Sequence, residues 1–328
     1  MPADTVMNIV LAAQEMAGLQ VLKQLARSSH RVVAVLTEPP RSSQDGRASL
    51  WNVASDLGFK TWPARMVKDP ALGETLRSEQ VDILLNVHSL FIIHPKVLAA
   101  PRFGAYNLHP ALLPRYAGLN SVSWAILHGE KEHGVTIHKM EPGIDTGAIV
   151  YQEHFPVGDE DTALALSFRC TQIGVALIFR LLDTVSATPD ALPLIPQELS
   201  GREYFGKEVP NGGDVCWKDS AERIVNFVRA FDYFPFRSPW GEPRTKLRSD
   251  EINVIKASRT ERASRAEPGT VDQVSESGAL VAGGDQWVLV KKLKLADKYF
   301  AAADLLKPGD RLEASAQRPM GVSNYAQF

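Results

Sequence analysis

The chain has 328 residues, which is enough for two domains of ordinary size. Apolar residues make up 45% and charged residues 23% of it, a balance typical of a folded globular protein with a sizeable core. With 36 lysines and arginines against 38 aspartates and glutamates, the net charge of −2 excludes a general attraction to nucleic acid or to an anionic membrane.

The first residues, MPADTVMNIVLAAQEM, contain no basic segment, and Gln14 and Glu15 interrupt their apolar run, which argues against a signal peptide. No apolar run is expected to approach the roughly 18 residues that span a bilayer. Cys170 and Cys216 lie in no CxxC or zinc-type pattern, which favours structural thiols in a reducing compartment. We therefore expect a cytoplasmic protein.

The chain begins with a strand, a helix and a second strand. Residues 7–13 form a short apolar run, residues 17–27 repeat leucines at helical spacing, and residues 31–38 form a continuous apolar strand. This order predicts a βαβ unit whose parallel strands are buried on both faces. Because no GxGxxG fingerprint follows the first strand, a dinucleotide site there is disfavoured.

The alternation of helices and strands continues to about residue 185. Further helices are expected at residues 50–58, 69–79, 95–100, 121–130 and 161–185, and further strands at residues 81–89, 105–110, 133–141 and 148–157. This pattern predicts an α/β, Rossmann-like domain with a mostly parallel sheet and helices on both faces. We assign it to residues 1–186.

The pattern changes in the C-terminal part. Residues 187–206 are rich in proline, show no period and read as a linker. A helix at residues 219–231 is followed by short strands separated by turn signals, among them INVIKAS, GTVDQV and WVLVKKLKL. This spacing predicts a small OB-like, all-β domain over residues 207–328.

Polar side chains occur at three predicted strand ends: NVHSL (86–90), NLHP (107–110) and the loop MEPGIDTG (140–147). Ligands of open α/β sheets bind beyond such ends. Asn107 and His109 are two residues apart and point to one face, while Asp145 lies in a glycine-containing loop returning to the sheet edge. Such groups suit acyl transfer to an amine. The amide and a protonated imidazole would stabilise the oxyanion, and the carboxylate would hold the imidazole and help remove the amine proton.

A histidine at a strand end is often only structural, and this alternative stays open for His109. For six further histidines the structural role is preferred: His88, His94, His128, His133, His138 and His154. No histidines have the HxxxH spacing of a metal site, and the sequence contains neither a GxSxG elbow nor a GxxxxGKS phosphate loop. We therefore expect no metal.

The block from Asn107 to Ile149 contains NLHPALLP, then GVT, then DTG. It closely resembles the folate-dependent formyltransferases, whose hallmarks Asn-x-His-x-(Ser/Ala)-LLP, Gly-Val-(Thr/Ser) and Asp-(Thr/Ala)-Gly follow in the same order. Ala111 stands where many members have serine. Together with the first βαβ unit and NVHSL, the resemblance covers about residues 7–185. It implies 10-formyltetrahydrofolate as formyl donor and Asn107, His109 and Asp145 as the catalytic residues.

The resemblance also implies a pterin pocket built largely from backbone groups of two loops. The residues at its expected positions are His88, Ser89, Leu90, Met140, Glu141 and Ile144. Leu90 and Ile144 are equally consistent with plain core.

The acceptor is the less determined part. Residues 202–240 resemble, more loosely, the domain boundary of the methionyl-tRNA and 4-amino-4-deoxyarabinose formyltransferases. Candidate acceptor contacts after the LLP motif and near this boundary are Arg115, Tyr116, Asn120, Tyr204, Phe205 and Trp217. Arginine pairs well with phosphate, and aromatic rings stack on bases. Each residue is equally consistent with a helix cap or a domain seam.

Charge separates tRNA from a small acceptor, because affinity for nucleic acid comes from neutralising phosphates. Residues 205–328 hold 19 lysines and arginines against 17 aspartates and glutamates. The loop at 39–49 has only Arg41 and Arg47, offset by Asp45, where methionyl-tRNA members usually carry a longer basic loop. These features favour a small, nucleotide-linked amino sugar. The KKLKL stretch is the opposing signal, although this alternation is typical of a strand with one solvated face.

Three alternatives remain. The first is methionyl-tRNA formylation with the β domain as RNA-binding module. The second is hydrolysis of the formyl donor, but hydrolytic relatives usually carry an extra N-terminal domain, and about six residues precede the first strand here. The third is a non-catalytic folate-binding or scaffold protein, against which the intact Asn, His and Asp set argues. The sequence does not predict the oligomeric state.

Overall fold

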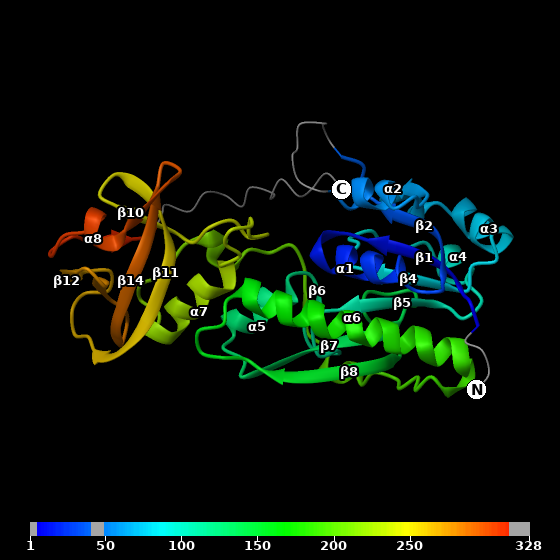
Figure 1. The fold of residues 1–328 in the computed structure, drawn as a ribbon. Helices are drawn as coiled ribbons and strands as arrows, with labels where there is room; N and C mark the ends of the chain where they lie inside the picture. Colours follow the sequence, from blue (N-terminus) through cyan, green and yellow to red (C-terminus); the bar gives the residue numbers. More distant parts are fainter. Residues whose placement is uncertain (1–4, 41–48, 315–328) are drawn as a thin grey trace.

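The computed structural model describes residues 5–40 and 49–314, which form an α/β domain and a β domain joined by a helix (Figure 1). The N-terminal sheet has seven strands in the order β3-β2-β1-β4-β5-β7-β8. Their bounds are β1 (Asn8–Ala13), β2 (Arg31–Thr37), β3 (Thr61–Pro63), β4 (Ile83–Val87), β5 (Ala105–His109), β7 (Glu132–Lys139) and β8 (Ile149–Pro156). The first five are parallel, and β7 and β8 are antiparallel to their neighbours. The predicted Rossmann-like, mostly parallel sheet is confirmed.

Helices cover both faces of this sheet. They are α1 (Glu15–Leu25), α2 (Leu50–Asp56), α3 (Ala71–Ser78), α4 (Pro95–Leu98), α5 (Ser121–Leu127) and α6 (Ala163–Ala187), with a 3-10 turn at Ala64–Lys68. Alternate residues of β1 pack into two hydrophobic cores on opposite faces of the sheet. Ile9 and Leu11 pack with α1 and α6, whereas Val10 packs with α3 and α4 on the other face. This two-sided burial explains the continuous apolar runs of the strands.

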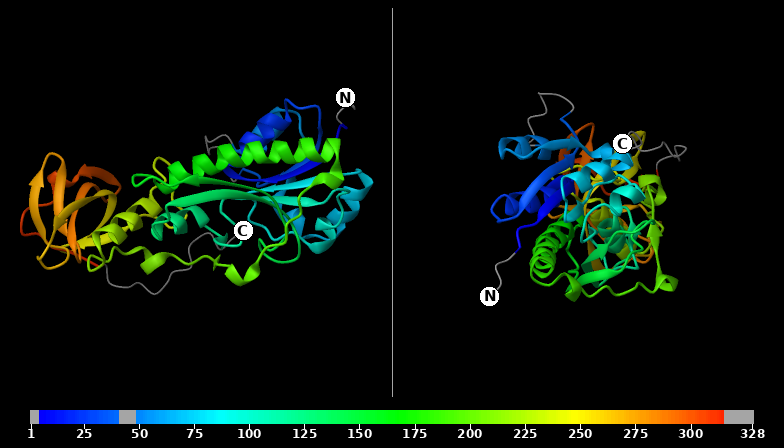
Figure 2. Two further views of the ribbon diagram at one scale, coloured as in Figure 1. Left: turned by 90° about the horizontal axis from the view of Figure 1, so that it is seen from below. Right: turned by 90° about the vertical axis from the view of Figure 1, so that its right-hand side faces the viewer.

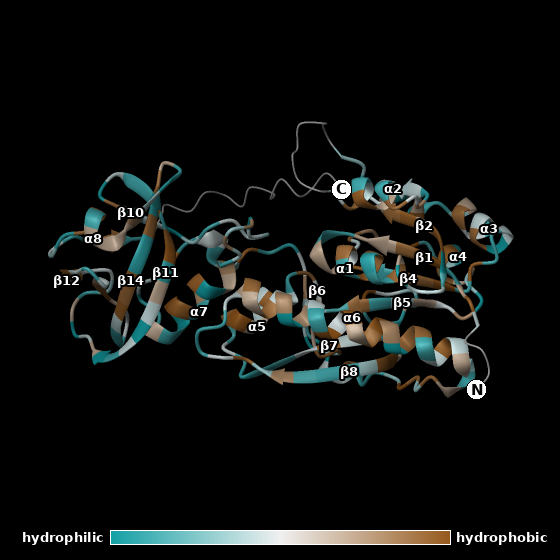
Figure 3. Ribbon diagram, viewed as in Figure 1, coloured by the Kyte–Doolittle hydropathy of each residue, from teal (hydrophilic) through white to brown (hydrophobic). Residues whose placement is uncertain are grey.

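The long helix α6 lies along one face of the sheet (Figure 2). Its N-cap Thr162 accepts a hydrogen bond from the Ala165 amide, and Gly174 lets it approach Leu108 of β5 closely. Within the described part of the chain, α6 has the length and composition to cross a membrane, which corrects the expectation that no segment comes near this limit. Hydrophobic and hydrophilic residues alternate along it (Figure 3), and its buried residues belong to the sheet core, as in a core helix of a globular domain.

The segment predicted as a linker packs against the N-terminal domain rather than running free. Ile195 forms an isolated antiparallel bridge with Ile149. Further along, β9 (Tyr204–Phe205) pairs in parallel with β6 (Ala117–Gly118). Short 3-10 turns at Pro189–Ala191 and Leu199–Gly201 lie within the segment, and another at Pro210–Gly213 follows it. The domain limits at 186 and 206 stay predictions. The basic residues of the 39–49 loop lie outside the described residues.

The C-terminal part begins with α7 (Ala221–Phe231), which packs against α5 and against β11. A curled antiparallel sheet follows, with the order β12-β13-β14-β11-β10-β16 and β15 paired with β14 (Figure 2). Its elements are β10 (Arg244–Leu247), β11 (Asp250–Ala263), β12 (Val271–Ser275), β13 (Gly278–Ala282), β14 (Gln286–Leu295), β15 (Lys298–Ala301), α8 (Ala302–Leu305) and β16 (Leu312–Glu313). The predicted all-β C-terminal domain is confirmed.

Candidate active site

The candidate site lies at the carboxyl end of β5, where the chain places Asn107 and His109 on one face of the sheet. Both side chains are buried. His109 Nε2 lies 2.8 Å from the backbone carbonyl of Tyr116, which only accepts hydrogen bonds, so this nitrogen carries a proton. The other ring nitrogen, Nδ1, lies 3.5 Å from Asp145 Oδ2. The imidazole is therefore held between a carbonyl and a carboxylate.

The loop between β7 and β8 brings Asp145 to these two residues. Its backbone is left-handed, with φ of 56°, and its side chain is 11% exposed. Oδ2 accepts a 2.8 Å hydrogen bond from the Gly118 amide, and Oδ1 lies 3.4 Å from Asn107 Nδ2. The structure thus brings together the three residues that the sequence analysis selected as a catalytic set.

The charges of this set follow from burial and from its contacts. Burial alone would raise the pKa of Asp145, but the charged forms of His109 and His138, together with the hydrogen bond from the Gly118 amide, outweigh it and hold this pKa below its usual range. Burial lowers the pKa of His109, although Asp145 and the Tyr116 carbonyl favour its cation. Asp145 is therefore a carboxylate at neutral pH, and burial favours the neutral form of the His109 imidazole.

The end of β4 offers polar atoms to a ligand. Asn86 Oδ1, His88 Nε2 and Ser89 Oγ are buried and have no hydrogen-bond partner among the residues that the structure describes. Buried polar atoms are almost always paired in folded proteins, so unpaired atoms in one short segment indicate a site for a polar molecule. The His88 backbone is left-handed, with φ of 58°, and its Nδ1 lies 3.4 Å from Glu15 Oε2.

The other residues of the expected pterin pocket differ in exposure. Leu90 is 55% exposed and Ile144 is 39% exposed, so neither is a core residue. Met140 is partly buried against the sheet core, and Glu141 is exposed. Leu90 directly follows the unpaired polar atoms of His88 and Ser89, a combination that fits a flat, partly polar ring such as a pterin.

The residues proposed to contact the acceptor lie in very different surroundings. Arg115 is exposed, but its guanidinium binds Glu130 at 2.6 Å and Glu203 at 3.1 Å. Tyr116 is buried and donates its hydroxyl to Glu130 at 2.7 Å, while its backbone carbonyl holds His109. Asn120 is half-buried and left-handed at the N-cap of α5. Arg115 is therefore already paired, and Tyr116 acts on the site through its backbone.

The aromatic candidates also divide. Tyr204 is 48% exposed. Phe205 stacks on Trp124, with ring centroids 4.6 Å apart, and on Tyr116 at 5.4 Å. Trp217 is 4% exposed and donates its indole N–H to Thr245 within the β domain. A base therefore has no open face of Trp217 on which to stack, and this residue is removed from the candidate contacts because it belongs to the core.

Three residues that contact the site were missed by the sequence analysis or assigned another role. Asn86 donates to Asn107 Oδ1 at 2.9 Å. His138, for which a structural role was preferred, lies 3.0 Å from Asn107 Nδ2 and 3.4 Å from Asp145 Oδ1. Polar residues in otherwise apolar strands were the available signal for both.

The third such residue is Gln197, which donates to the carbonyls of Asp145 at 2.9 Å and Gly147 at 2.7 Å. It lies in the segment predicted as a linker, and no local pattern marks it.

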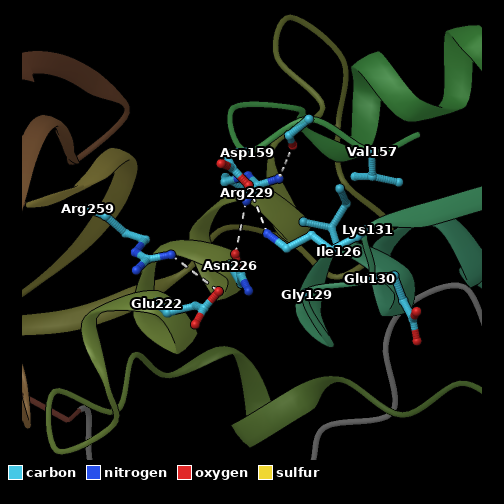
Figure 4. Close-up of a pocket in the computed structure, with 11 residues that line it drawn as sticks. Ile126, Gly129, Glu130, Lys131, Val157, Asp159, Glu222, Asn226, Arg229 and Arg259 are labelled. Carbon is cyan, nitrogen blue, oxygen red and sulfur yellow. Dashed lines mark hydrogen bonds and ion pairs between the residues drawn. The ribbon is translucent and has the colours of Figure 1, made fainter.

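A hollow lined by residues of both domains, shown in Figure 4, contains none of the catalytic candidates. Arg229 of α7 reaches across the seam to the carbonyls of Gly158 and Asp161. Two further cations at the hollow pair with carboxylates, in the pairs Lys131–Asp159 and Arg259–Glu222. With these charges compensated, the hollow is a structural seam.

The two-domain fold and the polar site beyond its strand ends are those of an enzyme that transfers a small acyl group. Residues 6–182 match the family model described as "Formyl transferase", and residues 209–308 match "Formyl transferase, C-terminal domain". The chain belongs to the folate-dependent formyltransferase family.

Sequence relatives and structural neighbours carry different acceptors in their names. A methionyl-tRNA formyltransferase of Methylobacillus flagellatus is 30% identical over 93% of this chain and 99% of its own length. One of Acidiphilium cryptum is 33% identical over 77% and 81%. WlaRD, a sugar 3N-formyl transferase crystallised with dTDP and 5-N-formyl-THF, superposes with a TM-score of 0.67 at 22% identity, covering 90% of this chain and 99% of its own. An N-formyltransferase of Helicobacter canadensis, in complex with folinic acid and dTDP-3-aminofucose, has a TM-score of 0.67 at 20% identity, covering 87% and 99%. The structural likeness shows the fold alone.

Proposed function

We propose that this enzyme transfers the formyl group of 10-formyltetrahydrofolate to the primary amine of a small acceptor, a nucleotide-linked amino sugar. The observation that carries the proposal is the convergence of the Asn107 amide, the neutral His109 imidazole and the charged Asp145 carboxylate. These groups lie beside the end of β4, where buried polar atoms have no hydrogen-bond partner among the described residues.

The strand end at residues 86–90 and the loop at 140–145 would hold the folate. Bound there, the folate supplies an activated formyl group on a nitrogen that is ready to leave. Asn86, His88 and Ser89 would pair with polar atoms of the pterin, and Leu90 and Ile144 would cover its ring. These contacts would place the formyl carbon above the end of β5.

Attack by the amine nitrogen forms a new C–N bond and leaves negative charge on the formyl oxygen. An N–H of Asn107 would donate a hydrogen bond to this oxygen. His109, neutral at rest and facing Asp145, would accept the proton that the amine loses, and the carboxylate would stabilise the resulting imidazolium. The C–N bond to the folate then breaks, and the leaving nitrogen takes up this proton, so that atoms and charge balance.

A small acceptor is favoured by the weak net charge of the C-terminal part and by the small number of proposed acceptor contacts. The C-terminal part from residue 205 has a charge of only +2, from 19 basic and 17 acidic residues. Asn120, Tyr204 and Phe205 remain as proposed acceptor contacts near the site, and Arg115 would have to leave Glu130 and Glu203 to bind a phosphate. The sugar substrates named for the structural neighbours support this acceptor class.

Methionyl-tRNA is the second candidate acceptor, and two observations favour it. The sequence relatives bear this name. The β domain also exposes Phe234, Phe236 and Tyr299, and Lys292 lies 5.0 Å from the ring of Phe234 and 4.6 Å from that of Tyr299. Exposed aromatic rings next to a cation suit stacking on unpaired bases.

The deciding experiment presents the purified protein and 10-formyltetrahydrofolate with three acceptors in parallel: amino-sugar nucleotides, methionyl-tRNA and water. Mass spectrometry would detect the added CO on a sugar nucleotide if the proposal holds. Formylation of methionyl-tRNA alone, with steep salt dependence, would establish the second candidate. Release of formate without either product would instead identify a hydrolase. His109→Ala serves as the inactive control, and activity that survives it would overturn the mechanism.

A further inference from the structure

Three buried polar side chains form a row across neighbouring strands of the sheet. Asn86 of β4 lies opposite Asn107 of β5, and Asn107 lies opposite His138 of β7. Asn86 Nδ2 donates to Asn107 Oδ1 at 2.9 Å, and Asn107 Nδ2 lies 3.0 Å from His138 Nε2. His138 Nδ1 lies 3.0 Å from the backbone carbonyl of Lys139. The row is therefore a continuous chain of hydrogen bonds.

The direction of every bond in the row follows from its last member. The Lys139 carbonyl can only accept, so His138 Nδ1 carries a proton; in the Nδ1–H tautomer, Nε2 is an acceptor that faces Asn107 Nδ2 at 3.0 Å and Asp145 Oδ1 at 3.4 Å. The atom of Asn107 that faces Nε2 must then be the N–H₂ group. Asn107 Oδ1 consequently faces Asn86, and Asn86 donates an N–H to it.

This direction matters because the amide of Asn107 has a donor end and an acceptor end. One N–H is used by His138, and the other is directed toward the reaction site, where Asp145 Oδ1 lies at a long 3.4 Å. If the amide turned over, Oδ1 would replace the N–H₂ group next to the developing oxyanion. A preorganised donor would become a repulsive acceptor.

We propose that Asn86 is a positioning residue that fixes the amide of Asn107 with its N–H₂ group toward the reaction site. The Asn86 side chain donates the hydrogen bond at the end of the row opposite the Lys139 carbonyl. Both Asn86 and Asn107 are buried there. Asn86 Oδ1 has no partner in the described part of the chain, so within the protein the bond to Asn107 is what orients this side chain. The kinetic consequence rests on the proposed function, whereas the orientation of the amide does not.

The test replaces Asn86 by aspartate and by leucine. Both keep the approximate volume. Aspartate offers only acceptors, so it attracts the N–H₂ group of Asn107 and turns the amide over. Leucine leaves Oδ1 of Asn107 unpaired. We expect N86D to lower kcat by about 100-fold, approaching the loss in N107A. We expect N86L to lower it by about tenfold, as for one lost hydrogen bond. Because Asn86 Oδ1 is also proposed to pair with the pterin, kcat is measured at saturating folate, and only the loss of kcat is assigned to positioning.

Two readouts separate positioning from a general structural effect. In the N107A background, N86D should cause no further loss of kcat, because its target is gone. In ¹⁵N-histidine spectra, assigned with the help of His138→Gln, wild-type His138 should show the Nδ1–H tautomer. This signature should disappear in N86D. Thermal melting identifies a variant that has failed to fold. If N86D fails to fold, the test is the tenfold loss of kcat expected in N86L and its absence in the N107A background.

The result that overturns the inference is an unchanged His138 tautomer with wild-type kcat in N86D, or an equal loss of kcat in the wild-type and N107A backgrounds. The spectra need no acceptor. A changed tautomer in a protein that formylates none of the tested amines would therefore refute the proposed function and uphold the orientation of Asn107.

Discussion

Gly147 offers a direct test of how strictly the position of Asp145 matters. It follows Asp145 by two residues, and a Cβ placed on it would lie 1.8 Å from the carbonyl oxygen of Lys139 and 2.9 Å from the carbonyl carbon. Ordinary contacts of a Cβ begin near 3.4 Å, so alanine requires the loop and the Lys139 carbonyl to move apart by roughly 1.6 Å. Because the obstructing oxygen belongs to the backbone of β7, the loop rather than the strand must move.

This movement should carry Asp145 away from His109 and from the Gly118 amide. A misplacement of about 1 Å in an active site costs about 100-fold in rate, so we expect Gly147→Ala to lower kcat by about 100-fold. The strain should lower the free energy of unfolding by about 1–3 kcal/mol. Steady-state kinetics with the accepted amine and urea unfolding measure the two effects separately.

Gly158→Ala is the matched control. Its Cβ would meet only the side chain of Asp161, at 3.4 Å, an ordinary contact, in the turn between β8 and α6. It should keep wild-type kcat. If Gly147→Ala also keeps kcat within a factor of about three, the dependence of the rate on loop position is refuted.

Three further predictions concern individual residues. Asn107→Ala should lower kcat by about 10²–10³ while the protein still binds 5-formyltetrahydrofolate; equal losses in binding and rate would argue against an oxyanion donor. Burial lowers the pKa of His133 from 6.5 to about 4, so the unfolded chain binds a proton more readily in this interval. This contribution to stability is complete above pH 6.5 and is lost as pH falls toward 4, by about 3 kcal/mol in the free energy of unfolding. Urea unfolding at several pH values should show a smaller pH dependence in His133→Phe, and identical slopes in both proteins would contradict the assignment. Trp217→Ala should cost about 3–5 kcal/mol of stability but leave KM for the acceptor unchanged; a selective rise in that KM would restore the stacking role.

Local patterns in the sequence were sufficient for the regular elements. The apolar run of β1 reflects the burial of consecutive strand residues, and the helical spacing in α6 reflects the burial of one helix face. Both patterns are visible within a short stretch of sequence. The alternation in Asn-Leu-His likewise determined that Asn107 and His109 share a face, because successive strand residues point to opposite sides. The three residues of β3 carry no such period, and their pairing with β2 depends on a distant segment.

Only the tertiary structure decided which residues far apart in the chain make contact. Gln197 reaches the Asp145 loop, 52 residues away, and β9 pairs beside Gly118, although the segment itself shows only proline and no period. The neutral state of His109 depends on its depth of burial, and the direction of the Asn107 amide depends on the Lys139 carbonyl through His138. The sequence determined which chemical groups meet at this site. Their protonation and orientation depend on desolvation and on hydrogen bonds across strands, which exist only once the sheet has formed.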